Sequence, residues 1–147
     1  MKLLSGKGSA GNAARKHAEV VILSGELGAG KTTFVQGFLK GAGIRGRAAS
    51  PTFVIMRHYR IARSASKDIA PFANIIHMDA YRLPLVATTT KNAAHLIALK
   101  FDEIVGDPGN IVLIEWGERI AGAVPKGALR VQFRYDKKEG SRIITIK

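Results

Sequence analysis

A glycine-rich segment near the start of the chain constrains the fold more than any other part of the sequence. It opens with a run of four apolar residues, at positions 20–23, which predicts a buried strand. The pattern G-x-x-x-x-G-K-[ST] follows, and it is filled by Gly25, Gly30, Lys31 and Thr32. Glycine lets the backbone approach a ligand with no Cβ in the way, so that successive N–H groups can surround phosphate oxygens. The segment is therefore predicted to be a phosphate-binding loop.

The residues after this loop have the pattern of an amphipathic helix. Residues 31–40 place four large apolar side chains on one face, and glycines at positions 41 and 43 end the periodic segment. The helix N-terminus adds a partial positive charge beside the loop. Lys31 is then placed to reach the β- and γ-phosphates, and the Thr32 hydroxyl to ligate Mg²⁺. A glycine-rich turn without a ligand is the alternative, which the agreement of motif and context disfavours.

Length and composition exclude several classes of protein. At 147 residues the chain is expected to form a single domain over 1–147, with a glycine-rich, atypical arm at 1–18. The absence of cysteine excludes disulfides, thiolate zinc sites and thiol catalysis. Every apolar run is too short to span a bilayer, and the first residues lack the apolar core of a signal peptide. We therefore expect a cytoplasmic protein.

The formal net charge of +12 favours polyanionic partners. The basic residues are scattered rather than gathered in one dense stripe, and no aromatic-rich motif for reading RNA is visible. A charge-driven contact with RNA and a merely solvated basic surface both remain compatible with this pattern.

Two later strands are each expected to end in a carboxylate. In residues 73–82, two isoleucines lead into His77 and Asp79, which share one face of a strand with period two. A carboxylate at the end of a buried strand can hold a metal-bound water or orient an attacking water, so Asp79 is a candidate catalytic residue. His77 is interpreted as a packed or hydrogen-bonded side chain rather than a catalyst.

The second of these strands is predicted at residues 110–116, where four apolar residues run into Glu115 and Trp116. The pattern resembles a Walker-B strand, which is buried on both faces and delivers its carboxylate to the Mg²⁺ shell. Glu115 is accordingly a candidate metal ligand or base, and a carboxylate at a helix start is the alternative. Trp116 can stack on a ligand or partner, although packing is the commoner use of tryptophan.

The other expected elements are shorter. Pro51 sets a corner before a strand at 53–59, and Thr52 at this corner is either a switch-like contact to the γ-phosphate or ordinary turn chemistry. Helical segments are predicted at 12–18, at 93–99 with Thr90 or Asn92 as the cap, at 101–105 and at 118–121. Apolar and polar residues alternate over 129–135, and a turn at 136–140 with a returning strand at 142–146 completes a predicted final hairpin. The expected fold class is α/β, a P-loop NTPase-like three-layer fold with a mixed sheet and an antiparallel C-terminal hairpin.

Four blocks together resemble the TsaE (YjeE) family in order and spacing: residues 25–33, 50–52, 77–82 and 114–116. The H-x-D-x-Y-R block followed by an E-W block is much more specific than the phosphate loop, which many families share. The resemblance implies a small Mg-dependent ATPase in the synthesis of threonylcarbamoyladenosine on ANN-decoding tRNAs, acting with TsaD-like and TsaB-like partners. This sequence departs from the family pattern in residues 1–18, which are shorter and richer in glycine than the family's usual strand and helix. Contacts to the adenine from this region are therefore expected to differ.

The resemblance also implies roles for individual residues. ATP phosphates would be held by Lys31 and by the backbone of Leu27, Gly28, Ala29, Gly30, Thr32 and Thr33. Mg²⁺ would be held by Thr32 and Glu115, and hydrolysis would need Asp79. Thr52 would line the γ-phosphate side, and Trp116 would lie beside the site. Two other functions stay open: a small P-loop metabolite kinase, and a switch module that binds nucleotide without turnover.

Overall fold

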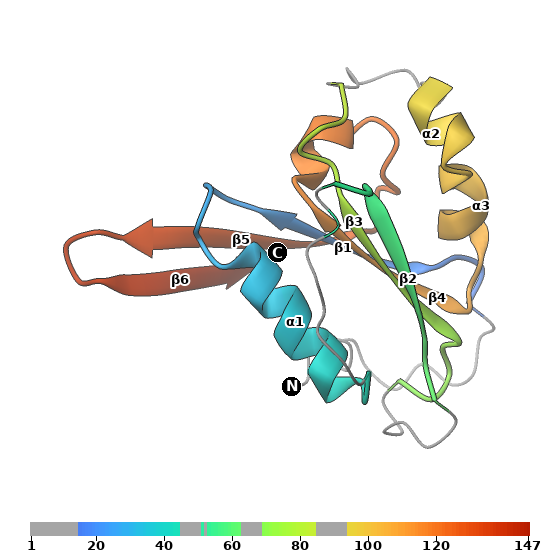
Figure 1. The fold of residues 1–147 in the computed structure, drawn as a ribbon, viewed down its shortest axis with the longest axis horizontal. Helices are drawn as coiled ribbons and strands as arrows, with labels where there is room; N and C mark the ends of the chain where they lie inside the picture. The colour runs from blue at the N-terminus through green and yellow to red at the C-terminus, as the bar shows by residue number, and fades with distance from the viewer. Residues whose placement is uncertain (1–14, 45–50, 52, 63–68, 85–93) are drawn as a thin grey trace.

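The computed structural model describes residues 15–44, 51, 53–62, 69–84 and 94–147. Six strands and four short helical segments follow one another along this part of the chain (Figure 1): β1 (Glu19–Ser24), α1 (Lys31–Gly41), β2 (Met56–Arg60), β3 (Asn74–Asp79), α2 (Ala94–Ala98), α3 (Phe101–Gly106), β4 (Asn110–Glu115), the 3₁₀ helix η1 (Gly117–Ile120), β5 (Leu129–Asp136) and β6 (Ser141–Ile146). None of the helices in the described ranges has the length and apolar character needed to cross a membrane.

All six strands form one mixed sheet in the order β2-β3-β4-β1-β5-β6. The four inner strands, β3, β4, β1 and β5, run parallel, and the two edge strands are antiparallel to their neighbours. The mixed sheet and the antiparallel C-terminal hairpin that were expected from the sequence are thus confirmed.

Alternation along the inner strands divides their side chains between two cores, one on each face of the sheet. One core packs beneath α1, whose buried residues Val35, Phe38 and Leu39 cover one face. The other core packs beneath α2, α3 and η1 through Leu96, Phe101 and Ile120. Helices on both faces make the three-layer arrangement, and Figure 1 shows α1 well apart from α2 and α3.

The strand expected at residues 53–59 begins later than predicted. Phe53 and Val54 lie in a turn, because the N–H groups of Val54 and Ile55 both donate to the carbonyl of Pro51, at 2.9 and 2.6 Å. Ile55 has a φ of 66°, outside the range of a strand, and β2 starts only at Met56. Pro51 therefore acts as the acceptor of a tight turn rather than as the corner directly before a strand.

The expected helices differ in detail from those observed. Residues 15–18 are not helical, and the N–H of Ala18 donates to Val105 instead, at 2.9 Å; the rest of the helix predicted at 12–18 lies outside the described residues, as do the proposed caps Thr90 and Asn92. Lys100, with a φ of 54°, separates α2 from α3. The turn expected at 118–121 is the 3₁₀ helix η1.

The loop between β1 and α1 is held against the C-terminal hairpin, which yields a test. Gly25 has a φ of 137°, and a Cβ there would collide with the carbonyl oxygen of Phe133 in β5. Gly25→Ala should therefore lower the free energy of unfolding by about 3 kcal/mol or more, measured by urea denaturation. Gly28→Ala is the matched control, since Gly28 has a φ of 77° but open space around it, and it should cost only about 1–2 kcal/mol. Equal losses would contradict the close approach to β5.

Candidate nucleotide-binding site

The segment from Gly25 to Gly30 connects β1 to α1 and has the backbone form of an anion-binding loop. Gly25, Gly28 and Gly30 all have positive φ angles, of 137°, 77° and 110°, which only glycine adopts at little cost. Gly30 caps α1 without a side-chain hydrogen bond, and the first turn of this helix contains no acidic residue. The first N–H groups of a helix lack intrahelical partners, so this helix end is suited to bind an anion.

Lys31, the first residue of α1, is folded back over this loop. Its ammonium group donates to the carbonyls of Gly25 and Glu26, at 2.6 and 2.9 Å. It also lies 3.9 Å from the centre of the Trp116 ring, as a cation–π contact. Burial lowers the pKa of Lys31 below its ordinary value, because desolvation of the ammonium outweighs the attraction of nearby carboxylates, that of Glu115 being the largest.

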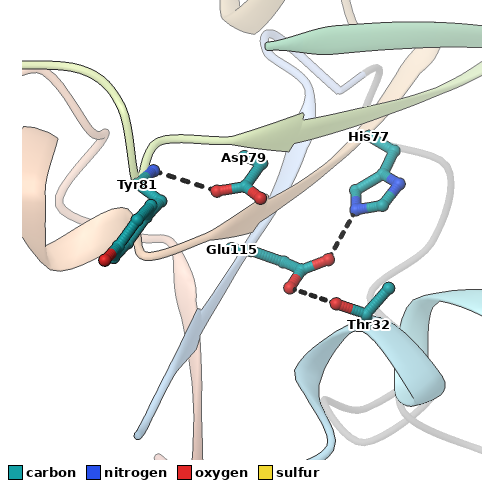
Figure 2. A network of polar contacts seen from close by, with 5 residues as sticks. All are labelled: Thr32, His77, Asp79, Tyr81 and Glu115. Atoms are coloured by element: carbon teal, nitrogen blue, oxygen red, sulfur yellow. Dashed lines mark hydrogen bonds and ion pairs between the residues drawn. The ribbon is translucent and has the colours of Figure 1, made fainter. Parts of the chain in front are cut away.

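Glu115, the last residue of β4, receives a hydrogen bond on each carboxylate oxygen (Figure 2). The Thr32 hydroxyl donates to Oε2 at 2.7 Å, and Nε2 of His77 lies 2.8 Å from Oε1. Glu115 and His77 are only 2% and 1% exposed. The carboxylate is therefore fixed between β3 on one side and the start of α1 on the other.

Asp79 ends β3 beside Glu115, since the parallel register of β3 and β4 pairs these two residues directly. Its Oδ1 accepts the backbone N–H of Tyr81 at 2.9 Å, as Figure 2 shows. The ring of Tyr81 in turn lies 5.2 Å from that of Trp116, centre to centre. The carboxyl ends of two neighbouring strands thus bring two acids and two aromatic rings to the phosphate-loop side of the sheet.

The donor set at this site suits a small, hard divalent cation. Mg²⁺ prefers oxygen ligands and is commonly held by one or two protein groups together with water and substrate phosphates. The Thr32 hydroxyl and the Glu115 carboxylate are such a pair of oxygens, already in contact at the N-terminus of α1. These two residues therefore fit the metal that the sequence motif implies.

Most of the residues predicted for the site lie together, although their roles stay predictions. Lys31, Thr32, Asp79, Glu115 and Trp116 are connected by the contacts above, around the loop that carries Leu27, Gly28, Ala29 and Gly30. The Leu27 side chain is 86% exposed, and Thr33 is exposed on the first turn of α1. Thr52 lies outside the described residues.

Two features of the site were not predicted. The interpretation of His77 as a packed or hydrogen-bonded residue agrees with its burial, but its partner, Glu115, was not foreseen. Arg142 of β6 lies beside the phosphate loop, with Cδ and Nε at 3.5 and 3.7 Å from where a Cβ on Gly30 would be. The alternation in the hairpin predicted the strand that carries Arg142, but only the order of strands in the sheet puts that strand next to the loop.

Comparison with known proteins agrees with this geometry. The family model of the threonylcarbamoyl adenosine biosynthesis protein TsaE matches residues 6–144. The tRNA threonylcarbamoyladenosine biosynthesis protein TsaE of Streptomyces coelicolor is 36% identical over 122 residues, which cover 83% of this chain and 71% of that protein. The protein of the same name from Treponema pallidum is 32% identical over 131 residues, or 89% of this chain and 83% of that protein.

A solved structure shares the architecture as well. The crystal structure of Bacillus subtilis YdiB is similar with a TM-score of 0.60 and 28% identity, over 90% of this chain and 69% of that chain. The fold and the site define an α/β protein whose mixed sheet carries a glycine-rich loop between its central strand and α1. Within this class, the chain belongs to the TsaE family.

The buried ammonium of Lys31 predicts how stability depends on pH. Its pKa is lowered in the folded chain, so the unfolded chain binds more protons as the pH approaches 10.5, and folding gains stability over that range. Lys31→Met removes this titration. The variant's unfolding free energy minus that of the wild type should therefore fall as the pH rises from 7 towards 10.5, measured by urea denaturation. Lys40→Met removes a charge from the exposed surface of the same helix and is the control; a difference for Lys31→Met that stays constant or grows would contradict the burial of a charged ammonium.

Proposed function

We propose that this protein is a Mg-dependent ATPase required for threonylcarbamoyladenosine modification of ANN-decoding tRNAs, acting in the cytoplasm with TsaD-like and TsaB-like partners. Membership of the TsaE family and the names of its relatives, which are tRNA threonylcarbamoyladenosine biosynthesis proteins, support the place in this modification. The chemistry of the site supports the ATPase activity.

The observation that carries the proposal is the 2.7 Å hydrogen bond between Thr32 and Glu115. It joins the first turn after the phosphate loop to the end of a strand that is buried over its whole length. A hydroxyl and a carboxylate so placed are the pair by which P-loop NTPases hold their metal ion. A glycine-rich turn that bound nothing would have no need of a buried carboxylate at this position.

Each residue of the site has a task in this scheme. The N–H groups of the loop and of the first turn of α1 bind the phosphates, and the ammonium of Lys31 exchanges its contacts with the Gly25 and Glu26 carbonyls for phosphate oxygens. Mg²⁺ bound at Thr32 and Glu115 would neutralise charge that develops on the phosphates. Asp79, beside Glu115, would orient the attacking water.

Partner proteins would set the rate of this reaction. In many enzymes, closure of a loop or domain over the substrate completes the catalytic site and limits the rate. The ring of Tyr81 is half exposed and contacts Trp116, and Leu27 projects from the phosphate loop. A protein bound over Tyr81 and Leu27 would change the surroundings of the nucleotide directly. Contact with tRNA would be driven by the charge of +12.

The decisive experiment is ATP hydrolysis by the purified chain, alone and with the TsaD-like and TsaB-like proteins of the same organism. We expect slow Mg-dependent hydrolysis that rises at least about tenfold when both partners are added. Glu115→Gln and Asp79→Asn should each leave ADP bound but lower the stimulated rate by about 100-fold or more, because the first weakens the metal site and the second removes the carboxylate that orients the attacking water. Phosphorylation of an added metabolite would favour a kinase, and tight ATP binding with no turnover under any condition would favour a switch module.

Nucleotide binding can be measured separately from turnover. Lys31→Ala removes the main cation facing the β- and γ-phosphates, and we expect ADP affinity to fall by about 10- to 100-fold, measured by calorimetry. In the wild-type chain, Mg-ADP should change the fluorescence of Trp116, the only tryptophan, because the ammonium that lies over its ring moves to the phosphates. Unchanged affinity of Lys31→Ala, or a flat fluorescence titration with binding shown by calorimetry, would contradict this arrangement. Lys40→Ala, at the far end of α1, is the matched control.

A further inference from the structure

His77 lies on β3, an inner strand of the sheet, and its side chain is buried, so that a polar group there costs free energy. It is 1% exposed in β3, and its strand neighbours Ile75, Ile76 and Met78 are fully buried. Burying a polar group without a hydrogen bond costs several kcal/mol. An apolar residue would pack at this position at lower cost, so the imidazole has some other use.

The only hydrogen-bond partner of this imidazole among the described residues is Glu115. Nε2 lies 2.8 Å from Oε1, whereas Nδ1 is buried and has no partner in the part of the chain that the structure describes. Because a carboxylate only accepts hydrogen bonds, Nε2 must carry the hydrogen. Among the described residues, the imidazole of His77 thus makes a single hydrogen bond, to one oxygen of Glu115.

That contact determines where the other oxygen of Glu115 points. With Oε1 bound to His77 on β3, the carboxylate plane is fixed, and Oε2 faces the Thr32 hydroxyl at 2.7 Å. Figure 2 shows Glu115 between these two side chains, which approach it from β3 and from α1. Two hydrogen bonds from separate elements hold both oxygens of the carboxylate and oppose its rotation.

A second attraction competes for the same carboxylate. Desolvation lowers the pKa of Lys31, and the negative charge of Glu115 opposes that shift, so the two charges attract each other. No ion pair joins them in the described ranges. Lys31 instead contacts carbonyls of the loop and the Trp116 ring. Without the His77 contact, Oε1 would be free to turn towards that ammonium, which would neutralise both groups before a nucleotide arrives.

We propose that His77 is a positioning residue, which holds the Glu115 carboxylate towards Thr32 and away from Lys31 so that both remain available to the metal and the phosphates. This inference rests on the proposed function. In metal sites generally, groups that orient a ligand from behind are worth about 10- to 100-fold in metal affinity. His77 itself touches neither the nucleotide nor the metal in this scheme.

Two substitutions of similar polarity separate positioning from packing. The amide nitrogen of His77→Gln is as many bonds from Cβ as Nε2 of histidine, so it can donate to Oε1. The amide nitrogen of His77→Asn corresponds to Nδ1 instead, and it falls short of Glu115. His77→Leu removes the donor but keeps the apolar packing, and it takes the place of His77→Asn if that variant does not fold.

The test is the affinity for ADP by calorimetry, with Mg²⁺ and with EDTA, for the wild type and each variant. The ratio of the two affinities reports the metal site without any turnover. We expect His77→Asn and His77→Leu to lower this ratio by about tenfold or more, and His77→Gln to stay within about threefold of the wild type. The affinity in EDTA should fall in His77→Asn and His77→Leu by less than the affinity with Mg²⁺, because a Glu115 carboxylate that turns towards Lys31 competes with the phosphates for its ammonium. In a Glu115→Gln background, His77→Asn should have no further effect on the ratio.

The outcomes distinguish this inference from the function on which it rests. If His77→Asn and His77→Leu have the same ratio of affinities as the wild type, the positioning role is overturned and the ATPase proposal stands. Equal losses for His77→Gln and His77→Asn, with affinity in EDTA lost in parallel, would mean that His77 serves the fold alone. A wild-type chain that binds ADP with no dependence on Mg²⁺ would overturn the metal site itself, and the role of His77 with it.

Discussion

The buried carboxylate of Glu115 is the point on which the rest of the site depends. A carboxylate that is 2% exposed is stable in a folded chain only if hydrogen bonds replace its lost water. Thr32 and His77 supply one bond each, and they do so from the start of α1 and from β3. Satisfying this single charge therefore fixes the distance between the phosphate loop and two strands. The same bonds that hold the fold together here also present one oxygen of the carboxylate to the side where phosphates would bind.

The register of the parallel strands turns this local requirement into a site. Strands β3 and β4 pair so that Asp79 lies opposite Glu115, and His77 lies opposite Leu113. Alternation then directs His77, Asp79 and Glu115 to the face covered by α1, where Thr32 begins the helix. A shift of one residue in either strand would send these side chains to the other core, beneath α2 and α3. Apolar residues at the remaining positions of both strands make that shift costly, so the core protects the geometry of the polar site.

Much of this arrangement was predictable, because it depends on patterns local in the sequence. The phosphate loop, the strand that leads into it and the acids at the ends of β3 and β4 were all predicted. The signals were the spacing of apolar residues, the glycine motif and the position of acidic residues after apolar runs. The start of β2 was not, because the two hydrogen bonds to the Pro51 carbonyl form a turn that propensity alone does not reveal. The bond between His77 and Glu115 was also missed, since it depends on which strands are neighbours. The approach of Arg142 to Gly30 has the same cause, a strand order that no local pattern encodes.

The placement of the C-terminal hairpin against the phosphate loop has a consequence for how the molecule assembles. Strand β5 pairs in parallel with β1, and the Phe133 carbonyl packs directly on Gly25, so the loop is held by residues that lie far from it in the sequence. Contacts of such long sequence separation form slowly, because the entropy of closing the intervening chain must be lost first. The glycine motif therefore takes its observed shape only once β5 has paired with β1, so that a local sequence pattern depends on a contact between distant parts of the chain.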